Sequence, residues 1–181
     1  MKHILLYGGR RSGRSAMIRA LLKGSDAPIY GYETRTLCTN EHGYHEIYLF
    51  PYGAAATDPG EHCHVGDCNT KQRVIFPEVF NTAGVSRLSF DRPGILVMDE
   101  IGFMESEASI FCDRVIECLN GEEPVIAAVR TGISTPFLER VRACESAYHI
   151  DMQPQNFQMI YRELRPVVRS WEALLRKEET P

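Results

Sequence analysis

The sequence predicts an α/β fold, with a mostly parallel sheet covered by helices on both faces. Three observations predict it: short continuous apolar runs, amphipathic segments that alternate with them, and a glycine-rich turn between the first run and the first helical segment. Continuous apolar runs are typical of parallel strands that are buried on both faces. The chain has no repeat, no low-complexity tract and no long linker, so we expect a single domain over residues 1–181.

The predicted elements follow in order along the chain. An apolar strand over residues 4–7 leads into a glycine-rich loop over 8–13 and a helix over 16–23. Further strands are expected at 28–32, 46–50, 95–98, 125–129 and 147–150. Helical spacing is found at 107–119, at 136–144, and on either side of Pro166, at 157–164 and 167–175. Residues 51–73 lack periodicity and are predicted to be an irregular loop or insertion.

Composition excludes several classes of protein. The chain has 181 residues, of which 44% are hydrophobic, with 20 Lys and Arg against 24 Asp and Glu. These proportions are ordinary for a globular domain, so disorder, a collagen-like fibre and a coiled coil are disfavoured. No apolar run approaches the ~18 residues that span a bilayer. The net charge of −4 argues against a nucleic-acid partner, which requires a surplus of Lys and Arg.

The N-terminal segment differs from the rest of the chain. Its apolar stretch is too short for a signal peptide before Gly8 interrupts it, so we expect a cytoplasmic protein with no membrane partner. Without a secretory signal, the six cysteines are expected to stay reduced. The first 20 residues contain five Lys or Arg and no Asp or Glu. This cationic end suits a single polyphosphate ligand.

A glycine-rich loop follows the first predicted strand. The run Gly-Gly-Arg-Arg-Ser-Gly-Arg-Ser at 8–15 fits the phosphate-loop pattern G-x-x-x-x-G-K-[ST] at every position but one, where Arg14 replaces Lys. In such a loop the backbone N–H groups and the helix N-terminus bind phosphate oxygens. We expect the nucleotide-binding residues to be Gly8, Gly9, Arg10, Arg11, Ser12, Gly13, Arg14, Ser15 and Ala16. The alternative is a tight turn without a ligand.

A second motif supports the phosphate-binding interpretation. The apolar strand predicted at 95–98 ends in Asp99 and Glu100. In a phosphate-loop fold, Asp99 would lie beside Ser15, where the two side chains hold Mg²⁺, and Glu100 would polarise the attacking water. The alternative is an ordinary strand end with two solvated acids. The combination of this motif with the loop is more specific than either motif alone.

These motifs resemble those of the small single-domain P-loop nucleoside-triphosphatases, also called cancer-related nucleoside-triphosphatases. The resemblance rests on three segments: the loop at 8–15, Gly-Tyr-Glu-Thr-Arg at 31–35, similar to the family's Gly-Phe-x-Thr, and Asp-Glu-Ile-Gly-Phe-Met-Glu at 99–105, close to the family's Asp-Glu-Ile-Gly-Lys-Met-Glu. It extends with gaps over residues 2–164. It implies a RecA-like α/β fold and slow, Mg²⁺-dependent hydrolysis of ATP, GTP and other nucleoside triphosphates.

The resemblance also implies roles for single residues. Arg14 and Glu100 would be catalytic, Ser15 and Asp99 would hold the metal, and Glu105 matches a family acid whose role stays unassigned. Two family lysines are replaced, by Arg14 in the loop and by Phe103 in the acidic signature. Because a guanidinium is bulkier than an ammonium, we expect nucleotide binding to tolerate Arg14 better than turnover does. The arginines that would compensate are Arg10, Arg11, Arg35 and Arg130.

Residues 62–68 concentrate His and Cys side chains, as His-Cys-His-Val-Gly-Asp-Cys. A structural zinc site needs four ligands, commonly from two Cys-x-x-Cys-like pairs. Here Cys63 and Cys68 are separated by four residues, and there is no second pair. We therefore favour a polar loop with incidental thiols over a zinc site.

Three functions are compatible with these patterns. The first is Mg²⁺-dependent hydrolysis of nucleoside triphosphates of the ATP or GTP type. The second is a nucleotide-binding module or switch that has lost turnover, which the replacements Arg14 and Phe103 suggest. The third is a small-molecule or nucleotide kinase, which would need an acceptor pocket and a lid with arginines; residues 51–73 supply only Lys71 and Arg73, so it ranks lowest.

Overall fold

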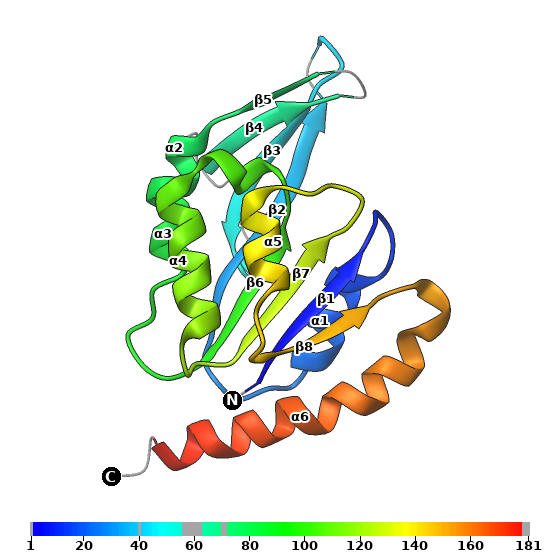
Figure 1. Ribbon diagram of the computed structural model, residues 1–181, viewed down its shortest axis with the longest axis vertical. Helices are drawn as coiled ribbons and strands as arrows, with labels where there is room; N and C mark the ends of the chain where they lie inside the picture. The colour runs from blue at the N-terminus through cyan, green and yellow to red at the C-terminus, as the bar shows by residue number, and fades with distance from the viewer. Residues whose placement is uncertain (1, 40, 56–62, 70–71, 179–181) are drawn as a thin grey trace.

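The computed structural model describes residues 2–39, 41–55, 63–69 and 72–178 (Figure 1). Its centre is an eight-stranded sheet in the order β5-β4-β3-β2-β6-β7-β1-β8. The strands are β1 (His3–Gly8), β2 (Ile29–Thr39), β3 (His45–Pro51), β4 (His64–Cys68), β5 (Arg73–Ile75), β6 (Ile95–Ile101), β7 (Val125–Arg130) and β8 (Ala147–Asp151). β2, β6, β7, β1 and β8 pair in parallel, which confirms the predicted mostly parallel sheet. β3, β4 and β5 add an antiparallel extension next to β2.

Helices cover both faces of the parallel part of the sheet (Figure 1). They are α1 (Arg14–Leu22), α2 (Pro77–Val79), α3 (Val85–Arg87), α4 (Ser109–Asn120), α5 (Pro136–Arg142) and α6 (Phe157–Glu178), with a π-helical turn at Phe80–Gly84 and 3-10 turns at Met104–Glu107 and Pro154–Asn156. Alternate residues of β1 belong to different cores: Ile4 and Leu6 pack with α1 and α6, whereas Leu5 and Tyr7 pack with α4 and α5. Both faces of β1 are therefore buried.

The last helix is longer than the sequence pattern suggests. Two helical segments were expected around Pro166, but α6 is one helix that contains this proline. Its buried side chains Leu164, Val168, Trp171 and Leu175 form a single stripe along α1 and the sheet. Burial of that stripe outweighs the hydrogen bond that proline cannot donate.

The antiparallel extension corrects two predictions. Residues 51–73 are not irregular throughout, because His64–Cys68 forms β4 and Arg73 begins β5, while 56–62 and 70–71 lie outside the described residues. β4 has the sequence His-Val-Gly-Asp-Cys, which contains no apolar run, so it has no strand signal. β2 continues past the predicted 28–32 to Thr39, and its polar second half is paired with β3 alone. The short helices over 77–87 were also not predicted.

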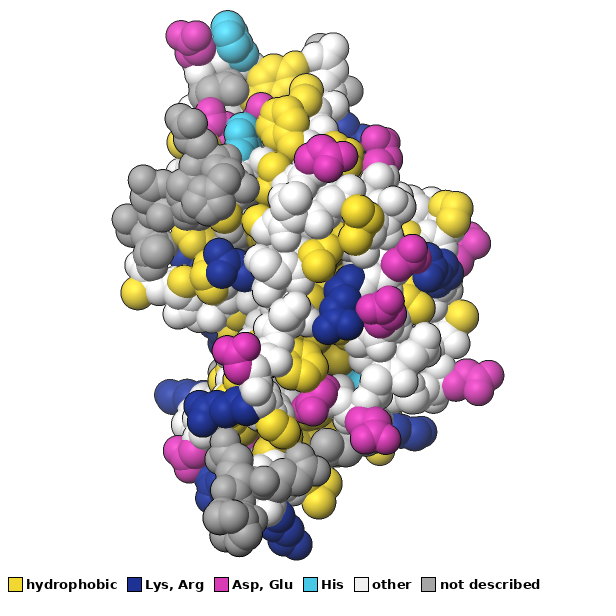
Figure 2. Space-filling model, turned by 90° about the vertical axis from the view of Figure 1, so that its left-hand side faces the viewer, with side chains coloured by type: hydrophobic (Ala, Val, Ile, Leu, Met, Phe, Trp, Pro, Cys, Tyr) yellow, Lys and Arg dark blue, Asp and Glu magenta, His cyan; other side chains and the backbone are white. Residues whose placement is uncertain are grey.

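Exposed apolar side chains occur both on the helices and around the extension. In Figure 2, apolar side chains are scattered among acidic and basic ones, and at the upper end, where the extension lies, apolar side chains lie beside His and acidic side chains. Leu37 of β2, Val74 of β5 and Phe76 after it are exposed. So are Ile110 of α4 and Met159 and Leu174 of α6. Among the described helices, none has the length and apolarity that crossing a bilayer requires.

Candidate functional site

The glycine-rich loop connects β1 with α1, as predicted. Gly8 ends β1 and Gly13 precedes α1, and the residues between them form the turn. Arg11 and Gly13 have positive φ angles of 60° and 94°, a backbone conformation that turns successive N–H groups toward one side. No side chain of the described residues caps the N-terminus of α1, and its first turn contains no acid. The loop therefore offers unpaired backbone donors to an anion.

The two predicted motifs meet at Ser15 and Asp99. The Ser15 hydroxyl donates a hydrogen bond of 2.8 Å to Asp99 Oδ1, although the two residues are 84 positions apart in the chain. Both lie at the carboxyl edge of the parallel strands, Ser15 after β1 and Asp99 in β6. Burial raises the pKa of the Asp99 carboxyl, and the hydrogen bond from Ser15 opposes this effect. A cation beside this carboxylate would offset the cost of its burial.

Glu100 lies between two guanidinium groups. Arg14 Nη2 donates to Glu100 Oε2 at 2.8 Å, and Arg130 Nη1 donates to Glu100 Oε1 at 3.0 Å. The pairing of β6 with β7 skips Glu100, a bulge that takes its side chain out of the regular alternation. The Tyr32 hydroxyl, fully buried, donates to the Glu100 backbone carbonyl at 3.3 Å. Hydrogen bonds to the side chain and to the backbone of Glu100 therefore both hold its carboxylate in place.

The orientation of Arg14 was not anticipated. Its side chain is buried and folds back over the loop, where Nε donates to Ser12 Oγ and Nη2 donates to the Gly9 carbonyl, each at 3.2 Å. Nη1 is also buried and has no hydrogen-bond partner among the described residues. A buried donor without a partner costs about 1–3 kcal/mol. An anion in the loop would supply the missing acceptor.

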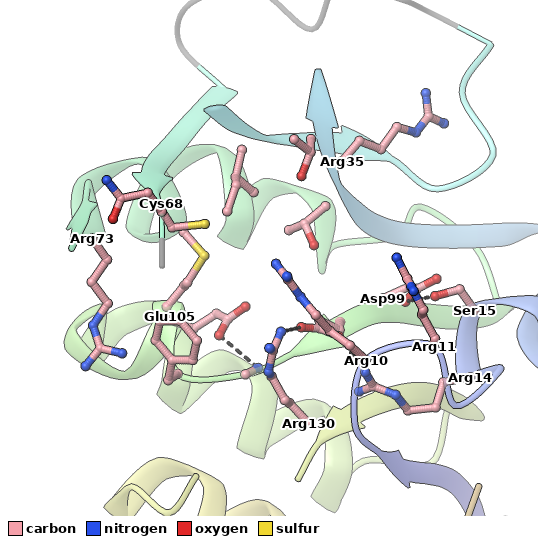
Figure 3. A pocket seen from close by; sticks show the side chains of 18 of the residues that line it. Arg10, Arg11, Arg14, Ser15, Arg35, Cys68, Arg73, Asp99, Glu105 and Arg130 are labelled. Atoms are coloured by element: carbon pink, nitrogen blue, oxygen red, sulfur yellow. Dashed lines mark hydrogen bonds and ion pairs between the residues drawn. The ribbon is translucent and has the colours of Figure 1, made fainter. Parts of the chain in front are cut away.

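The loop and the acids line one cavity of about 720 Å³. Six arginines surround it: Arg10, Arg11, Arg14, Arg35, Arg73 and Arg130. Three acids face them: Asp99, Glu100 and Glu105. Figure 3 shows Arg10 and Arg11 extending from the loop into the cavity. This excess of positive charge contrasts with the net charge of −4 of the chain and favours a polyanionic ligand.

The other predicted residues are placed as follows. Ser12 is buried beneath the loop, Gly9 and Ala16 are exposed, and Gly8 is buried. Of the arginines expected to compensate for the loop lysine, Arg130 contacts Glu100. Arg35 instead pairs with Glu33 at 2.6 Å and lies over the Phe50 ring.

Sequence reasoning did not find the partners of Phe103. The Arg73 guanidinium lies 4.5 Å from the centre of the Phe103 ring, and that of Arg130 lies 5.9 Å from it. Arg73 comes from β5, at the end of the segment that was expected to be irregular. No signal in the sequence relates Arg73 to Phe103, because their proximity depends on the register of the extension.

Glu105 has a structural role in the same region. It is buried, and its Oε2 accepts a hydrogen bond from the Gly102 N–H at 2.9 Å. Burial raises the pKa of this carboxyl to about 7. Glu105 therefore fixes the turn that follows β6 and carries Phe103.

The described His and Cys side chains of 62–68 do not converge on one point, as the ligands of a metal ion would. Cys63 is buried, Cys68 lines the cavity, and His62 lies outside the described residues. His64 Nε2 and Asp67 Oδ1 form a hydrogen bond of 2.9 Å, and the His64 ring stacks on the Tyr48 ring. Within the described ranges, no three His, Cys, Asp or Glu side chains are grouped so that they could hold a metal ion.

The chain is similar to known proteins in part of its sequence and in its fold. A family model described as NTPase matches residues 55–165, a range that begins after the phosphate loop. No curated protein matches the chain. The crystal structure of THEP1 from the hyperthermophile Aquifex aeolicus has a TM-score of 0.70 at 16% identity, covering 92% of this chain and 98% of that one. The solution structure of a human cancer-related nucleoside triphosphatase has a TM-score of 0.63 at 19% identity, covering 94% and 98%.

The two kinds of match support different conclusions. At such low identities the solved structures show the fold, and they confirm the expected RecA-like α/β architecture. The family model extends over more than half of the 181 residues. The chain therefore belongs to the NTPase family.

Proposed function

We propose that the chain, as one nucleotide-binding domain, binds a nucleoside triphosphate with Mg²⁺ on the loop between β1 and α1 and slowly hydrolyses it to the diphosphate and phosphate. The hydrogen bond of 2.8 Å between Ser15 and Asp99 carries this proposal, because it joins the phosphate loop to the acidic strand end. Membership of the NTPase family supports it. One of the two similar structures is named a nucleoside triphosphatase. ATP and GTP are therefore the first substrates to test.

Binding would use the loop backbone and the nearby cations. The N–H groups over 8–16 would contact the phosphates, assisted by Arg10 and Arg11, and Arg14 Nη1 would gain its missing acceptor. Ser15 and Asp99 would hold Mg²⁺, since hydroxyl and carboxylate oxygens are the donors that this ion prefers. When bound, Mg²⁺ neutralises phosphate charge.

Hydrolysis would depend on Glu100. Its carboxylate would orient the water and accept its proton as the bond between the terminal phosphate and the leaving diphosphate breaks. Each of its oxygens already accepts one guanidinium hydrogen bond, from Arg14 or from Arg130, and keeps a second acceptor site at which a water can bind. Movement of Arg14 toward a phosphate would release Oε2.

Phosphate release by the pure protein tests this proposal. With ATP or GTP and Mg²⁺ we expect turnover that chelation of the metal abolishes. Glu100→Gln should reduce the rate about 100-fold, because the general base is lost. Glu117→Gln, at an exposed acid of α4, is the matched control and should leave the rate unchanged. Equal rates for wild type and Glu100→Gln would show that hydrolysis is not the function.

The ion pair between Arg14 and Glu100 favours a second candidate, a nucleotide-binding module that has lost turnover. In that case the guanidinium keeps Glu100 occupied even when nucleotide is bound. The variant Arg14→Lys separates the candidates, with Arg140→Lys at an exposed pair as control. A gain of about tenfold or more, equivalent to about 1.4 kcal/mol of activation free energy, favours the module. An unchanged or lower rate favours the hydrolase.

A further inference from the structure

We propose that the cavity binds a second ligand beside the triphosphate: a small carboxylate or phosphate compound held by Arg73 and Arg130. This inference rests on the proposed function, because the triphosphate fills the loop side of the same cavity. The second site is the part of the cavity lined by Ile47, Cys68, Gln72, Arg73, Phe103 and Met104.

The second site lies across the cavity from the phosphate loop. In Figure 3, Cys68 and Arg73 are on the opposite side from Arg11 and Ser15, with Arg130 between them. These residues come from β4, β5 and the end of β7, and not from the loop.

The position of the loop determines which end of a triphosphate faces the second site. Phosphate loops hold the metal and the terminal phosphates beside their serine and the strand acids. Here those groups are Ser15, Asp99 and Glu100. Arg130, which pairs with Glu100, lies between them and Arg73. The second site is therefore beyond the terminal phosphate. The ribose and base, attached at the other end, extend away from it.

The charge of the second site defines its ligand. Arg73 is exposed at the edge of the sheet, and among the described residues its guanidinium forms no ion pair or hydrogen bond. It shares the Phe103 ring with Arg130, which uses Nη1 to bond Glu100. Both guanidinium groups therefore lie against the same ring and line the same cavity. A carboxylate or phosphate in this part of the cavity would accept N–H bonds from Arg73, and Arg130 would add positive charge at the same cavity.

The remaining lining residues set the size and polarity of the ligand. Ile47 and Met104 contribute apolar surface, and Gln72 contributes an amide. A cavity of about 720 Å³ falls within the usual size of small-molecule sites and is shared here by two ligands. A compound with one anionic group and a small apolar body matches this lining.

Alkylation of Cys68 tests the inference. Cys68 lines the second site, whereas Cys38 is exposed on β2, outside the cavity lining, and serves as internal control. The protein is saturated with AMP-PNP and Mg²⁺, and iodoacetamide labelling of each cysteine is followed by mass spectrometry. Phenyl phosphate and benzoate are added in separate arms. We expect labelling of Cys68 to continue with AMP-PNP alone, and to be slowed by at least one of the two compounds while Cys38 is unaffected.

Arg73→Gln provides the matched variant. Removing the guanidinium should weaken the protection about tenfold, the equivalent of about 1.4 kcal/mol for a lost charged hydrogen bond. Arg140→Gln, at an exposed pair on α5, should leave the protection unchanged. The arm that protects identifies the ligand as a phosphate or a carboxylate.

Four results would overturn the inference. Complete protection of Cys68 by AMP-PNP alone would show that the nucleotide itself fills the second site. Absence of protection by either compound, or equal protection in Arg73→Gln, would show that the arginines hold no such anion. A separate calorimetric titration distinguishes the remaining case: if AMP-PNP does not bind at all, the proposed function fails together with this inference.

Discussion

The parallel part of the sheet and its antiparallel extension differ in how they are stabilised. In the parallel part, helices cover both faces, and the strand residues of β6 and β7 are almost entirely buried. In the extension, the residues of β3, β4 and β5 are less buried, and Val74 of β5 is exposed to solvent. The cavity lies where the two regions meet, because the parallel part supplies the loop and the acids, and the extension supplies Cys68 and Arg73. The more deeply buried region thus positions the loop and the acids, while the less buried region lines the opposite side of the cavity.

Unequal burial predicts unequal sensitivity to substitution, and this is the largest effect expected. Phe111 is fully buried between the Tyr32 and Phe80 rings, at 5.6 and 5.3 Å between ring centres. Phe111→Ala should lower the free energy of unfolding by about 3–5 kcal/mol. Val74→Ala, in the extension, should change it by less than about 0.5 kcal/mol. Urea unfolding measures both, and similar losses would contradict the difference between the regions.

The pH dependence of stability tests the buried acid at the junction. Because the folded pKa of Glu105 is raised from 4.5 to about 7, its contribution to stability is complete below pH 4.5 and is lost as the pH rises through 7. Glu105→Gln does not titrate, so its stability relative to wild type should increase by about 3 kcal/mol from low to high pH. Glu107→Gln, exposed in the same turn, is the control. A pH-independent difference between Glu105→Gln and wild type would contradict the burial of a carboxyl with this pKa.

Cysteine reactivity should separate the regions by a smaller margin. Cys112 packs in the core under the parallel strands, and burial raises the pKa of its thiol to about 12. Cys38 is exposed in the second half of β2. Iodoacetamide should modify Cys38 about 100-fold faster than Cys112 in the native protein, because reaction at Cys112 requires local opening. Equal rates would show that the core around α4 opens as readily as the extension.

The same contrast explains which elements could be predicted from the sequence. The parallel strands at 4–7, 95–98 and 125–129 are continuous apolar runs because both of their faces are buried. β4 lacks this signal, since it is short and contains Gly66 and Asp67. Pro166 was a misleading signal, because the packing of α6 overrides it.

The candidate site divides in a similar way. Ser15, Asp99 and Glu100 follow from local motifs, and the structure brings all three together at one cavity. The contact of Arg73 with Phe103 depends on how distant strands pair, which no local pattern encodes. The orientation of the Arg14 side chain depends on its hydrogen bond to Glu100, which is 86 residues away in the chain. Roles of single residues in binding and catalysis stay predictions.

Calorimetric titration of AMP-PNP tests most directly whether Ser15 and Asp99 form the metal side of a nucleotide site. Wild type should bind AMP-PNP with Mg²⁺, and chelation of Mg²⁺ should weaken binding about tenfold, or about 1.4 kcal/mol. Ser15→Ala should remove that dependence on the metal, whereas Ser86→Ala, at an exposed serine of α3, should keep it. Failure of wild type to bind, or an unchanged metal dependence in Ser15→Ala, would contradict the proposed site.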